Sequence, residues 1–331
     1  MSDPLTYKDA GVDTEHAAEL VKDIAALRKK TEGSRSLYSA FGLFAAGMDL
    51  SDYKHPIILA ACDGVGTKLE LLLKHDLLEI AGIDLVAMNV NDILTCNGQP
   101  LMFLDYIGVP KLDDEQIRRL ISGMTDGLAQ CDCLLAGGET AEMPGVVPEG
   151  IVELSGFVVG AAEKEDLLDP TEIKVGDTLI GVPSNGIHAN GFSLVRRVLK
   201  QVELSDDEMH QLLAPTRIYH AEVKALQDLA LRPSGMAHIT GGGLRENLQR
   251  ILGDDKGADL SIPYWDNAAA QKILAPLKLD EAIHTFNMGI GWVIILPADH
   301  AHTALSALPE AFQIGTVTDN AGLVNVEVDA P

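Results

Sequence analysis

The sequence lacks the features of several common protein classes. No apolar run approaches the ~20 residues that span a bilayer, and Met1 to Pro4 do not begin a basic and then apolar leader. Basic residues are scarce: 25 Lys and Arg stand against 49 Asp and Glu, for a formal net charge of −24. Nucleic acid is bound by basic patches. We therefore expect a soluble, cytoplasmic protein that binds neither membrane nor nucleic acid.

Two familiar site patterns are also missing. The four cysteines, at positions 62, 96, 131 and 133, include no Cys-x-x-Cys pair, which argues against a zinc site or a disulfide framework. Reduced thiols are the simplest interpretation. The sequence also contains no Gly-x-x-x-x-Gly-Lys-Ser/Thr loop. Any nucleotide must therefore be bound by a different arrangement.

The order of apolar segments predicts an α/β protein of two domains. A chain of 331 residues is long for one domain at ~100–200 residues each. Short apolar runs predict strands at 57–61, 101–109, 134–136 and 157–162, and helical spacing predicts helices at 84–95 and 113–129. Turn residues at 169–177 mark a boundary, which gives domains 1–170 and 171–331. The second half repeats the α/β pattern, with strands at 178–183, 235–240 and 288–296 and helices at 192–200 and 217–231. Residues up to Gly33 form a mildly polar arm.

The first candidate site is the segment Asp63-Gly64-Val65-Gly66-Thr67-Lys68, directly after a predicted strand. The glycines allow backbone N–H groups to approach a ligand, Asp63 can face a cation, and Lys68 offers a charge for phosphate. An ordinary turn from a strand into a helix is an equally good interpretation of this segment alone.

The second candidate site is a polar group of residues on the predicted helix 84–95. Asp84 and Asn91 share one face, and Asn89 and Asp92 share an adjoining one. No basic residue occurs from Gly82 to Pro100. Short oxygen-bearing side chains without lysine suit Mg²⁺ better than a solvated surface, which is the alternative.

The third candidate site is the segment from Gly137 to Gly145. It places Glu139 and Glu142 in glycine-rich backbone, where Thr140 can cap a turn that Pro144 and Gly145 end. Alone, this is a turn with incidental glutamates. Together with the two preceding segments, it predicts one wall of a site for a cation and a phosphate.

The second half contains two loops with histidine. The segment from Ser184 to Ser193 leads into a helix whose first turn lacks acidic residues, and such a helix start can bind an anion. His188 lies in this loop, and His238 precedes a run of three glycines. Either histidine can serve as a general acid or base. A capped helix and structural histidines are the alternatives.

Together these segments resemble the aminoimidazole ribonucleotide synthetases, the phosphoribosylformylglycinamidine cyclo-ligases of purine biosynthesis. The resemblance covers nearly the whole chain. It includes the three acidic segments, both histidine loops, and the further segments Tyr7 to Asp13, Phe103 to Tyr106, Leu213 to Tyr219 and Thr285 to Gly289.

The resemblance implies ATP-dependent cyclisation of formylglycinamidine ribonucleotide (FGAM) to aminoimidazole ribonucleotide (AIR), with ADP and phosphate as the other products. ATP would phosphorylate the formamide oxygen, and an amidine nitrogen would then attack that carbon. Such chemistry depends on positioning and charge neutralisation. The family also implies a homodimer in which mixed N-terminal sheets form a shared barrel, α/β C-terminal domains, and an active site in a cleft between domains.

The resemblance also assigns roles to residues. ATP binding is expected at Asp63, Gly64, Gly66, Thr67, Lys68, Asp84, Asn89, Asp92, Gly137, Gly138 and Glu139, with Asp63, Asp92 and Glu139 as Mg²⁺ ligands. FGAM binding is expected at Ser184, Asn185, Gly186, His188 and Asn190, and catalysis at Lys68, His188 and His238. Which histidine is the base stays open.

The sequence departs from the family in one place. The family has a glycine-rich segment before Phe-Gly-Gly-Leu-Phe in the loop over the nucleotide, whereas Ser36 to Ala40 lack glycine. This departure motivates an alternative, a nucleotide-binding scaffold without turnover. Another alternative is a related synthetase or kinase. Selenophosphate synthetase is disfavoured because no cysteine precedes Cys62.

Overall fold

The computed structural model describes residues 14–33, 35–38 and 44–330. The predicted segment Tyr7 to Asp13 and positions 39–43 of the altered loop lie outside these residues. The chain divides into two compact units. The first unit comprises residues up to 65, 69–90 and 100–161; the second comprises 66–68, 91–99 and 162–331. The second unit thus includes two short segments that precede the predicted boundary at 170.

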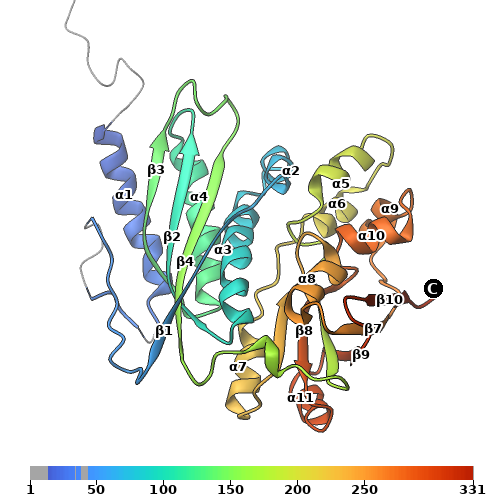
Figure 1. Ribbon diagram of the computed structural model, residues 1–331. Helices are drawn as coiled ribbons and strands as arrows, with labels where there is room; N and C mark the ends of the chain where they lie inside the picture. Colours follow the sequence, from blue (N-terminus) through green and yellow to red (C-terminus); the bar gives the residue numbers. More distant parts are fainter. Residues whose placement is uncertain (1–13, 34, 39–43, 331) are drawn as a thin grey trace, which may run out of the picture. The chain divides into compact units, whose positions relative to one another are not determined.

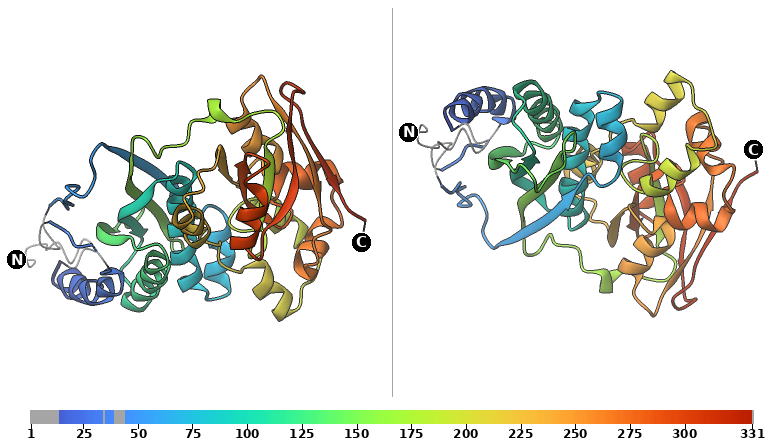
Figure 2. Two further views of the ribbon diagram at one scale, coloured as in Figure 1. Left: turned by 90° about the horizontal axis from the view of Figure 1, so that it is seen from below. Right: turned by 90° about the horizontal axis from the view of Figure 1, so that it is seen from above.

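The first unit is a four-stranded sheet with helices on one face (Figures 1 and 2). The strand order is β1-β4-β2-β3, and β2 pairs with β3 in parallel. Its elements are α1 (Thr14–Arg28), η2 (Lys29–Thr31), β1 (Pro56–Gly64), α2 (Lys68–Lys74), α3 (Leu78–Thr95), β2 (Gln99–Val109), α4 (Asp114–Ala129), β3 (Leu134–Glu142) and β4 (Glu153–Glu163). Lys68 and the end of α3 belong to the second unit.

Helix α4 shows how the sequence specifies these elements. Asp113 accepts a hydrogen bond from the Gln116 backbone N–H at 3.1 Å and so caps the first turn. Ile117, Ile121 and Met124 recur at helical spacing and are buried. The predicted helix at 113–129 is therefore confirmed, with its first residue as the cap.

The second unit is a six-stranded mixed sheet in the order β10-β7-β9-β5-β8-β6. Only the pair β10 and β7 is parallel. The strands are β5 (Thr178–Pro183), β6 (Gly235–His238), β7 (Gly257–Ile262), β8 (Ile290–Leu296), β9 (Phe312–Thr318) and β10 (Val324–Val328). The helices are η3 (Pro170–Glu172), α5 (Phe192–Val198), α6 (Asp206–Leu212), α7 (His220–Asp228), α8 (Gly243–Leu252), α9 (Ala268–Leu274), α10 (Leu279–Thr285) and α11 (Ala301–Ala307).

A large hydrophobic cluster of the second unit lies on one face of this sheet. Trp292, Ile294 and Leu296 alternate along β8 toward a cluster completed by α7 and α11. Leu94, near the end of α3, belongs to the same cluster. This packing connects the polar end of α3 to the sheet that carries His238. No helix in the described part of the chain is long and apolar enough to cross a membrane.

The polar arm before Gly33, for which no secondary structure was predicted, contains helix α1, because its alanines and leucines favour a helix. Two local expectations are wrong. The segment from Gly137 to Glu142 is strand β3 rather than a turn capped by Thr140, because its backbone pairs with β2. The helix expected at 217–231 is the shorter α7, and residues 217–219 lie before it.

Candidate functional site

The predicted site residues range from exposed to buried, and Gly64, Gly137, Ser184 and Asn190 are half-buried. The proposed metal ligands Asp63, Asp92 and Glu139 are exposed, as are Gly66, Thr67 and Gly138. Asp84, Asn89, Lys68, His188 and His238 are buried. The exposed carboxylates can reach a ligand from solvent, whereas the buried groups act within the protein.

In the first unit, Asn89 holds the end of strand β1. Its Oδ1 accepts a hydrogen bond from the Asp63 backbone N–H at 2.9 Å, and its Nδ2 donates to the Asp63 carbonyl oxygen at 3.2 Å. Nδ2 also donates to the Leu85 carbonyl oxygen at 2.8 Å. The amide of Asn89 therefore fixes the backbone that carries Asp63.

Strand β3 places Gly138 beside a carboxyl that the sequence analysis gave no role. Gly138 pairs with Asp105 of β2, and a Cβ at position 138 would lie 2.2 Å from Asp105 Oδ1. Glycine is therefore required at position 138 for close approach. Burial raises the pKa of Asp105 to about 7, and the nearby charge of Glu139 adds to this increase.

Glu142, the second carboxylate of the predicted turn, has a structural contact. Its Oε1 accepts a hydrogen bond from the Leu112 backbone N–H at 2.8 Å. This bond ties the end of β3 to the loop after β2. Glu139 is thus the exposed carboxylate of the pair.

In the second unit, Lys68 is fully buried. Its Nζ donates a hydrogen bond to the Ala214 carbonyl oxygen at 2.7 Å and lies 5.7 Å from the centre of the Phe192 ring. The neighbouring hydroxyls of Thr67 and Ser193 are 3.2 Å apart. The segment 66–68 is therefore fixed beside the start of α5.

The loop from Ser184 to Gly191 is held by internal hydrogen bonds. Ser184 Oγ and Asn287 Nδ2 both donate to the Gly186 carbonyl oxygen, at 2.7 and 2.9 Å. The Asn185 backbone N–H donates to His188 Nε2 at 3.3 Å. These contacts bring Ser184, Asn185, Gly186 and His188 together, as a binding loop requires, and Asn190 follows before α5.

His188 has unusual geometry and electrostatics. Its φ is 61°, in the left-handed region that a histidine rarely occupies. Burial, and then the nearby His238, Lys68 and Arg217, hold the pKa of His188 well below its ordinary value. The ring is therefore neutral at pH 7, the state in which a histidine can accept a proton.

His238 ends strand β6 and contacts two residues of α3. Its Nδ1 lies 3.2 Å from Asp92 Oδ1, and its Nε2 lies 3.3 Å from Asn91 Nδ2. Its side chain is 2% exposed, whereas that of Asp92 is 49% exposed. The histidine thus lies beneath a carboxylate that faces solvent.

An aromatic cluster packs against both histidines. The Tyr219 and Trp292 rings stack with centroids 5.2 Å apart, and each has one histidine ring at 6.2 Å. A Cβ at Gly291 would lie 2.1 Å from the Tyr219 hydroxyl oxygen and 2.3 Å from His188 Cε1. Glycine at position 291 therefore lets the two rings approach the strand.

Several residues of these arrangements were missed or given no role by the sequence analysis. They are Asp105, Tyr219, Asn287 and Gly291, while Asn91 was noted only for its helix face. A usable signal existed for Asp105, because strand alternation places it on the same face as Phe103 and Ile107, which are buried. The others depend on contacts between segments far apart in the sequence.

The metal prediction stays a prediction. Within the described residues, no group of three or more His, Cys, Asp or Glu side chains is arranged to hold a metal ion. Asp63 and Glu139 belong to the first unit and Asp92 to the second. All three offer carboxylate oxygens, which is the donor chemistry that Mg²⁺ prefers, and one or two carboxylates suffice when phosphates complete the shell.

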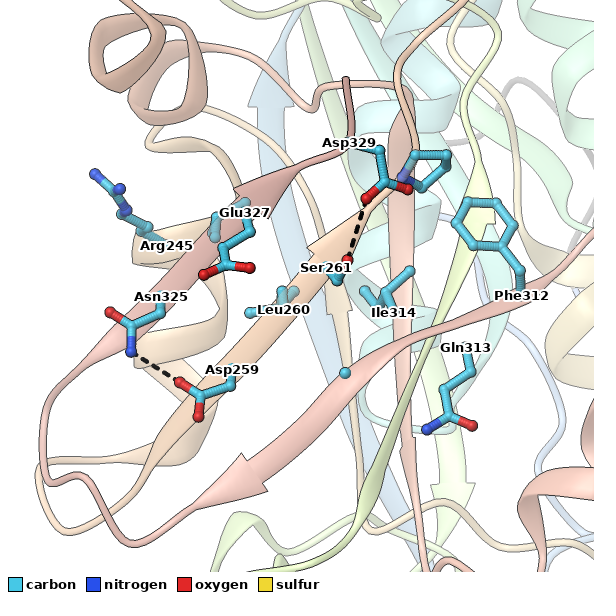
Figure 3. Close-up of a pocket in the computed structure, with 13 residues that line it drawn as sticks. Arg245, Asp259, Leu260, Ser261, Phe312, Gln313, Ile314, Asn325, Glu327 and Asp329 are labelled. Carbon is cyan, nitrogen blue, oxygen red and sulfur yellow. Dashed lines mark hydrogen bonds between the residues drawn. The ribbon is translucent and has the colours of Figure 1, made fainter. Parts of the chain in front are cut away.

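A large groove in the second unit contains none of the predicted residues. Its volume is about 1210 Å³, and it lies over β7, β9 and β10 (Figure 3). Asn325 Nδ2 donates to Asp259 Oδ1 at 2.8 Å, and Ser261 Oγ donates to Asp329 Oδ1 at 3.4 Å. These are exposed polar contacts across neighbouring strands, typical of a solvated sheet face.

Comparison with known proteins finds relatives along almost the entire chain. The models for AIR synthase related protein, N-terminal and C-terminal domains, match residues 45–162 and 174–326. Proteins named phosphoribosylformylglycinamidine cyclo-ligase are similar. Those of Thermosynechococcus vestitus and Thermoanaerobacter pseudethanolicus are 39% and 40% identical, covering 97% and 96% of this chain and 98% and 99% of the relatives. That of Leptospira interrogans is 41% identical and covers 95% of each chain.

Solved structures of lower identity share the fold. The hydrogenase maturation protein HypE in complex with ATP matches with a TM-score of 0.69 at 17% identity, over 97% of this chain and 93% of that chain. Thiamine-monophosphate kinase from Stenotrophomonas maltophilia matches with a TM-score of 0.63, also at 17% identity, over 92% of this chain and 95% of that chain. At such identities the likeness concerns the fold alone.

Proposed function

The chain belongs to the family of phosphoribosylformylglycinamidine cyclo-ligases, and we propose that it catalyses the ATP-dependent closure of FGAM to AIR in the cytoplasm. The observation that carries this proposal is the identity of about 40% to proteins of that name over nearly the full length of both chains. The three acidic segments and both histidine loops lie within the matched ranges.

The reaction has two steps that balance without a protein nucleophile. The formamide oxygen of FGAM takes the γ-phosphoryl group of ATP, and ADP leaves. An amidine nitrogen then forms a bond to the formyl carbon, the carbon–oxygen bond breaks, phosphate leaves with that oxygen, and a nitrogen proton is released. The protein must position the reactants, neutralise phosphate charge and accept the proton.

We assign ATP binding to the exposed acidic segments. Asp63 and Glu139 in the first unit and Asp92 in the second have accessible carboxylates that suit Mg²⁺, which neutralises phosphate charge when bound. Gly66 and Thr67 offer backbone N–H groups, whereas the Gly64 N–H donates to Asp63 Oδ1 at 2.7 Å and so orients that carboxylate. Asn89 supports Asp63 through its two hydrogen bonds to that backbone. Gly138 leaves room for Asp105, Gly137 precedes it on β3, and Asp84 and Lys68 are buried.

We assign the FGAM end to the loop from Ser184 to Asn190. Asn185 is exposed, and Gly186 and His188 are fixed by the hydrogen bonds of Asn287 and Asn185. His188 is neutral near pH 7 because burial and nearby positive groups disfavour its protonated form. We propose it as a candidate for proton transfer during ring closure.

We also propose a homodimer formed through the uncovered face of the first unit's sheet. Tyr106 and Phe157 are 38% and 46% exposed and alternate with buried residues, and Ile58 on edge strand β1 is 65% exposed. An apolar sheet face without helices is a typical surface for association. Light scattering should give twice 35.4 kDa. Phe157→Asp should shift the mass toward the monomer, and Val175→Asp, an exposed apolar position of the second unit, should not. A monomeric wild type would refute the dimer.

A coupled assay tests the reaction directly. Purified protein receives FGAM, ATP and Mg²⁺, while ADP release and the aminoimidazole product are followed together. We expect both products in equal amounts, and neither when FGAM is omitted. Nucleotide binding without turnover would contradict the proposal and favour the scaffold alternative.

A further inference from the structure

Asn91 uses both ends of its side-chain amide. It is fully buried near the end of α3. Its Oδ1 accepts a hydrogen bond from the Tyr219 backbone N–H at 3.1 Å, and its Nδ2 donates to the Arg217 carbonyl oxygen at 2.9 Å. A rotated amide would set N–H against N–H and oxygen against oxygen. The backbone at 217–219 therefore fixes which end of the amide is which.

This fixed amide determines where His238 carries its proton. Asn91 Nδ2 can only donate, and it lies 3.3 Å from His238 Nε2. Nε2 must therefore present its lone pair, which leaves the proton of the neutral ring on Nδ1. Nδ1 lies 3.2 Å from Asp92 Oδ1, so this N–H is directed at the carboxylate.

We propose that Asn91 is a positioning residue that fixes the Nδ1–H tautomer of His238, and that His238 in turn orients the Asp92 carboxylate. The proposal rests on the proposed function, because the orientation matters where Asp92 binds the metal of ATP. Residues that orient a metal-ligating side chain are commonly important for binding: their removal weakens metal affinity by about 10–100-fold.

The same geometry separates the two histidines. Both ring nitrogens of His238 are engaged, one by Asn91 and one by Asp92. In His188, Nε2 accepts from the Asn185 N–H, while Nδ1 has no hydrogen-bond partner among the described residues. By the same rule, the neutral ring of His188 carries its proton on Nδ1, so its unpartnered nitrogen is a donor, whereas both nitrogens of His238 serve its neighbours.

Histidine-ring ¹⁵N NMR of the full-length protein without nucleotide tests the first step. His238→Phe identifies the signals of ring 238 by their loss. We expect the wild-type ring to be protonated at Nδ1 and unprotonated at Nε2. A proton on Nε2 in the wild type would overturn the proposal, and this outcome requires no variant to fold.

Asn91→Asp tests the role of the amide. The carboxylate still accepts from the Tyr219 N–H but presents an acceptor to His238, so Nε2 should become protonated. Asn97→Asp is the matched control, because Asn97 also belongs to the second unit and bonds Asp166 and Gln227 rather than His238. Ring 238 should be unchanged in the control. An unprotonated Nε2 in folded Asn91→Asp would contradict the assignment.

Metal binding tests the second step. Electron paramagnetic resonance of Mn²⁺ in the presence of ADP measures affinity without turnover. His238→Phe removes the N–H that faces Asp92 while Asn91 keeps its bond to Arg217. We expect affinity to fall about 10-fold. Equal affinity would overturn the step from His238 to Asp92. The tautomer result does not depend on FGAM, so it is distinguishable from failure of the cyclisation assay.

Discussion

The polar residues of the two units are organised differently. In the first unit, Asp63 and Glu139 are exposed at strand β1 and strand β3, and the buried Asp105 lies beside a glycine. In the second unit, the buried His238 and Asn91 belong to one hydrogen-bond network that includes the half-exposed Asp92. Exposed carboxylates can therefore be changed with little effect on folding, whereas changes within the network should alter folding and chemistry together.

Asp92→Asn should produce the largest loss of activity. Asparagine keeps an oxygen for the His238 N–H but loses the charge that suits Mg²⁺. We expect Mg²⁺-dependent ADP formation to fall at least about 100-fold. The measurement is the initial rate of ADP release across a Mg²⁺ titration, with FGAM saturating.

Thermal unfolding provides the control for this variant. The Asp92 side chain is half exposed, so the melting temperature of Asp92→Asn should remain close to that of the wild type. An unchanged rate at limiting Mg²⁺ would remove Asp92 from the metal site. A large loss of stability would show that Asp92 belongs with the buried network rather than at its edge.

Asp105→Asn should have the next largest effect, on stability rather than activity. The folded state raises the pKa of Asp105 to about 7, so between about pH 4 and 7 the unfolded chain ionises this carboxyl before the native protein does. Stability from this group is therefore lost as pH rises through that window. At pH 8 the free energy of unfolding of the variant should exceed that of the wild type by roughly 1–3 kcal/mol. At pH 5 this difference should be smaller.

Urea unfolding at the two pH values measures this difference. Glu139→Gln is the matched control, because it removes only the neighbouring charge, which is a smaller cause of the raised pKa than burial. The increase in the free energy of unfolding should be smaller for Glu139→Gln than for Asp105→Asn. A gain of the same size at pH 5 and pH 8 would mean that the ionisation of Asp105 is not responsible.

The sequence predicted elements whose signals are local. Helix α4 was found because Asp113 caps it and its apolar residues recur at helical spacing. Strand β5 matched its apolar run, Thr178–Pro183. The predicted strand at 134–136 ended too early, because the glycines and glutamates that follow are uncommon in strands. Pairing with β2 shows that these residues belong to strand β3. Helix α1 was missed because its apolar face is weak.

The site was predictable to a smaller extent. Motifs identified Asp63, Glu139 and both histidine loops, because the resemblance to the family is carried by short segments that can be recognised in the sequence. The role of Asn91 depends on Arg217 and Tyr219, which are more than 120 residues away in the sequence. Such a contact has no local pattern. The sequence therefore identified exposed ligand-type residues better than the buried residues that position them.

His188→Asn should give the smallest effect, a change in the pH dependence of stability. It tests a buried polar residue of the second unit. Burial lowers the pKa of His188 well below that of an exposed histidine, so acidification protonates the unfolded chain first. Stability is therefore present above about pH 6.5 and is lost as pH falls below it. Asparagine tolerates the left-handed backbone and can accept the Asn185 N–H through its oxygen, but it does not ionise.

Between pH 7.5 and 5.5, the wild type should therefore lose about 2–4 °C of melting temperature more than His188→Asn does. His302→Asn is the control, because His302 is exposed on α11 and should give a profile like that of the wild type. Parallel profiles for the wild type and His188→Asn would show that His188 is protonated equally in the folded and unfolded chains. His188 would then titrate like an exposed histidine, and the contrast between buried and exposed polar groups would fail at this residue.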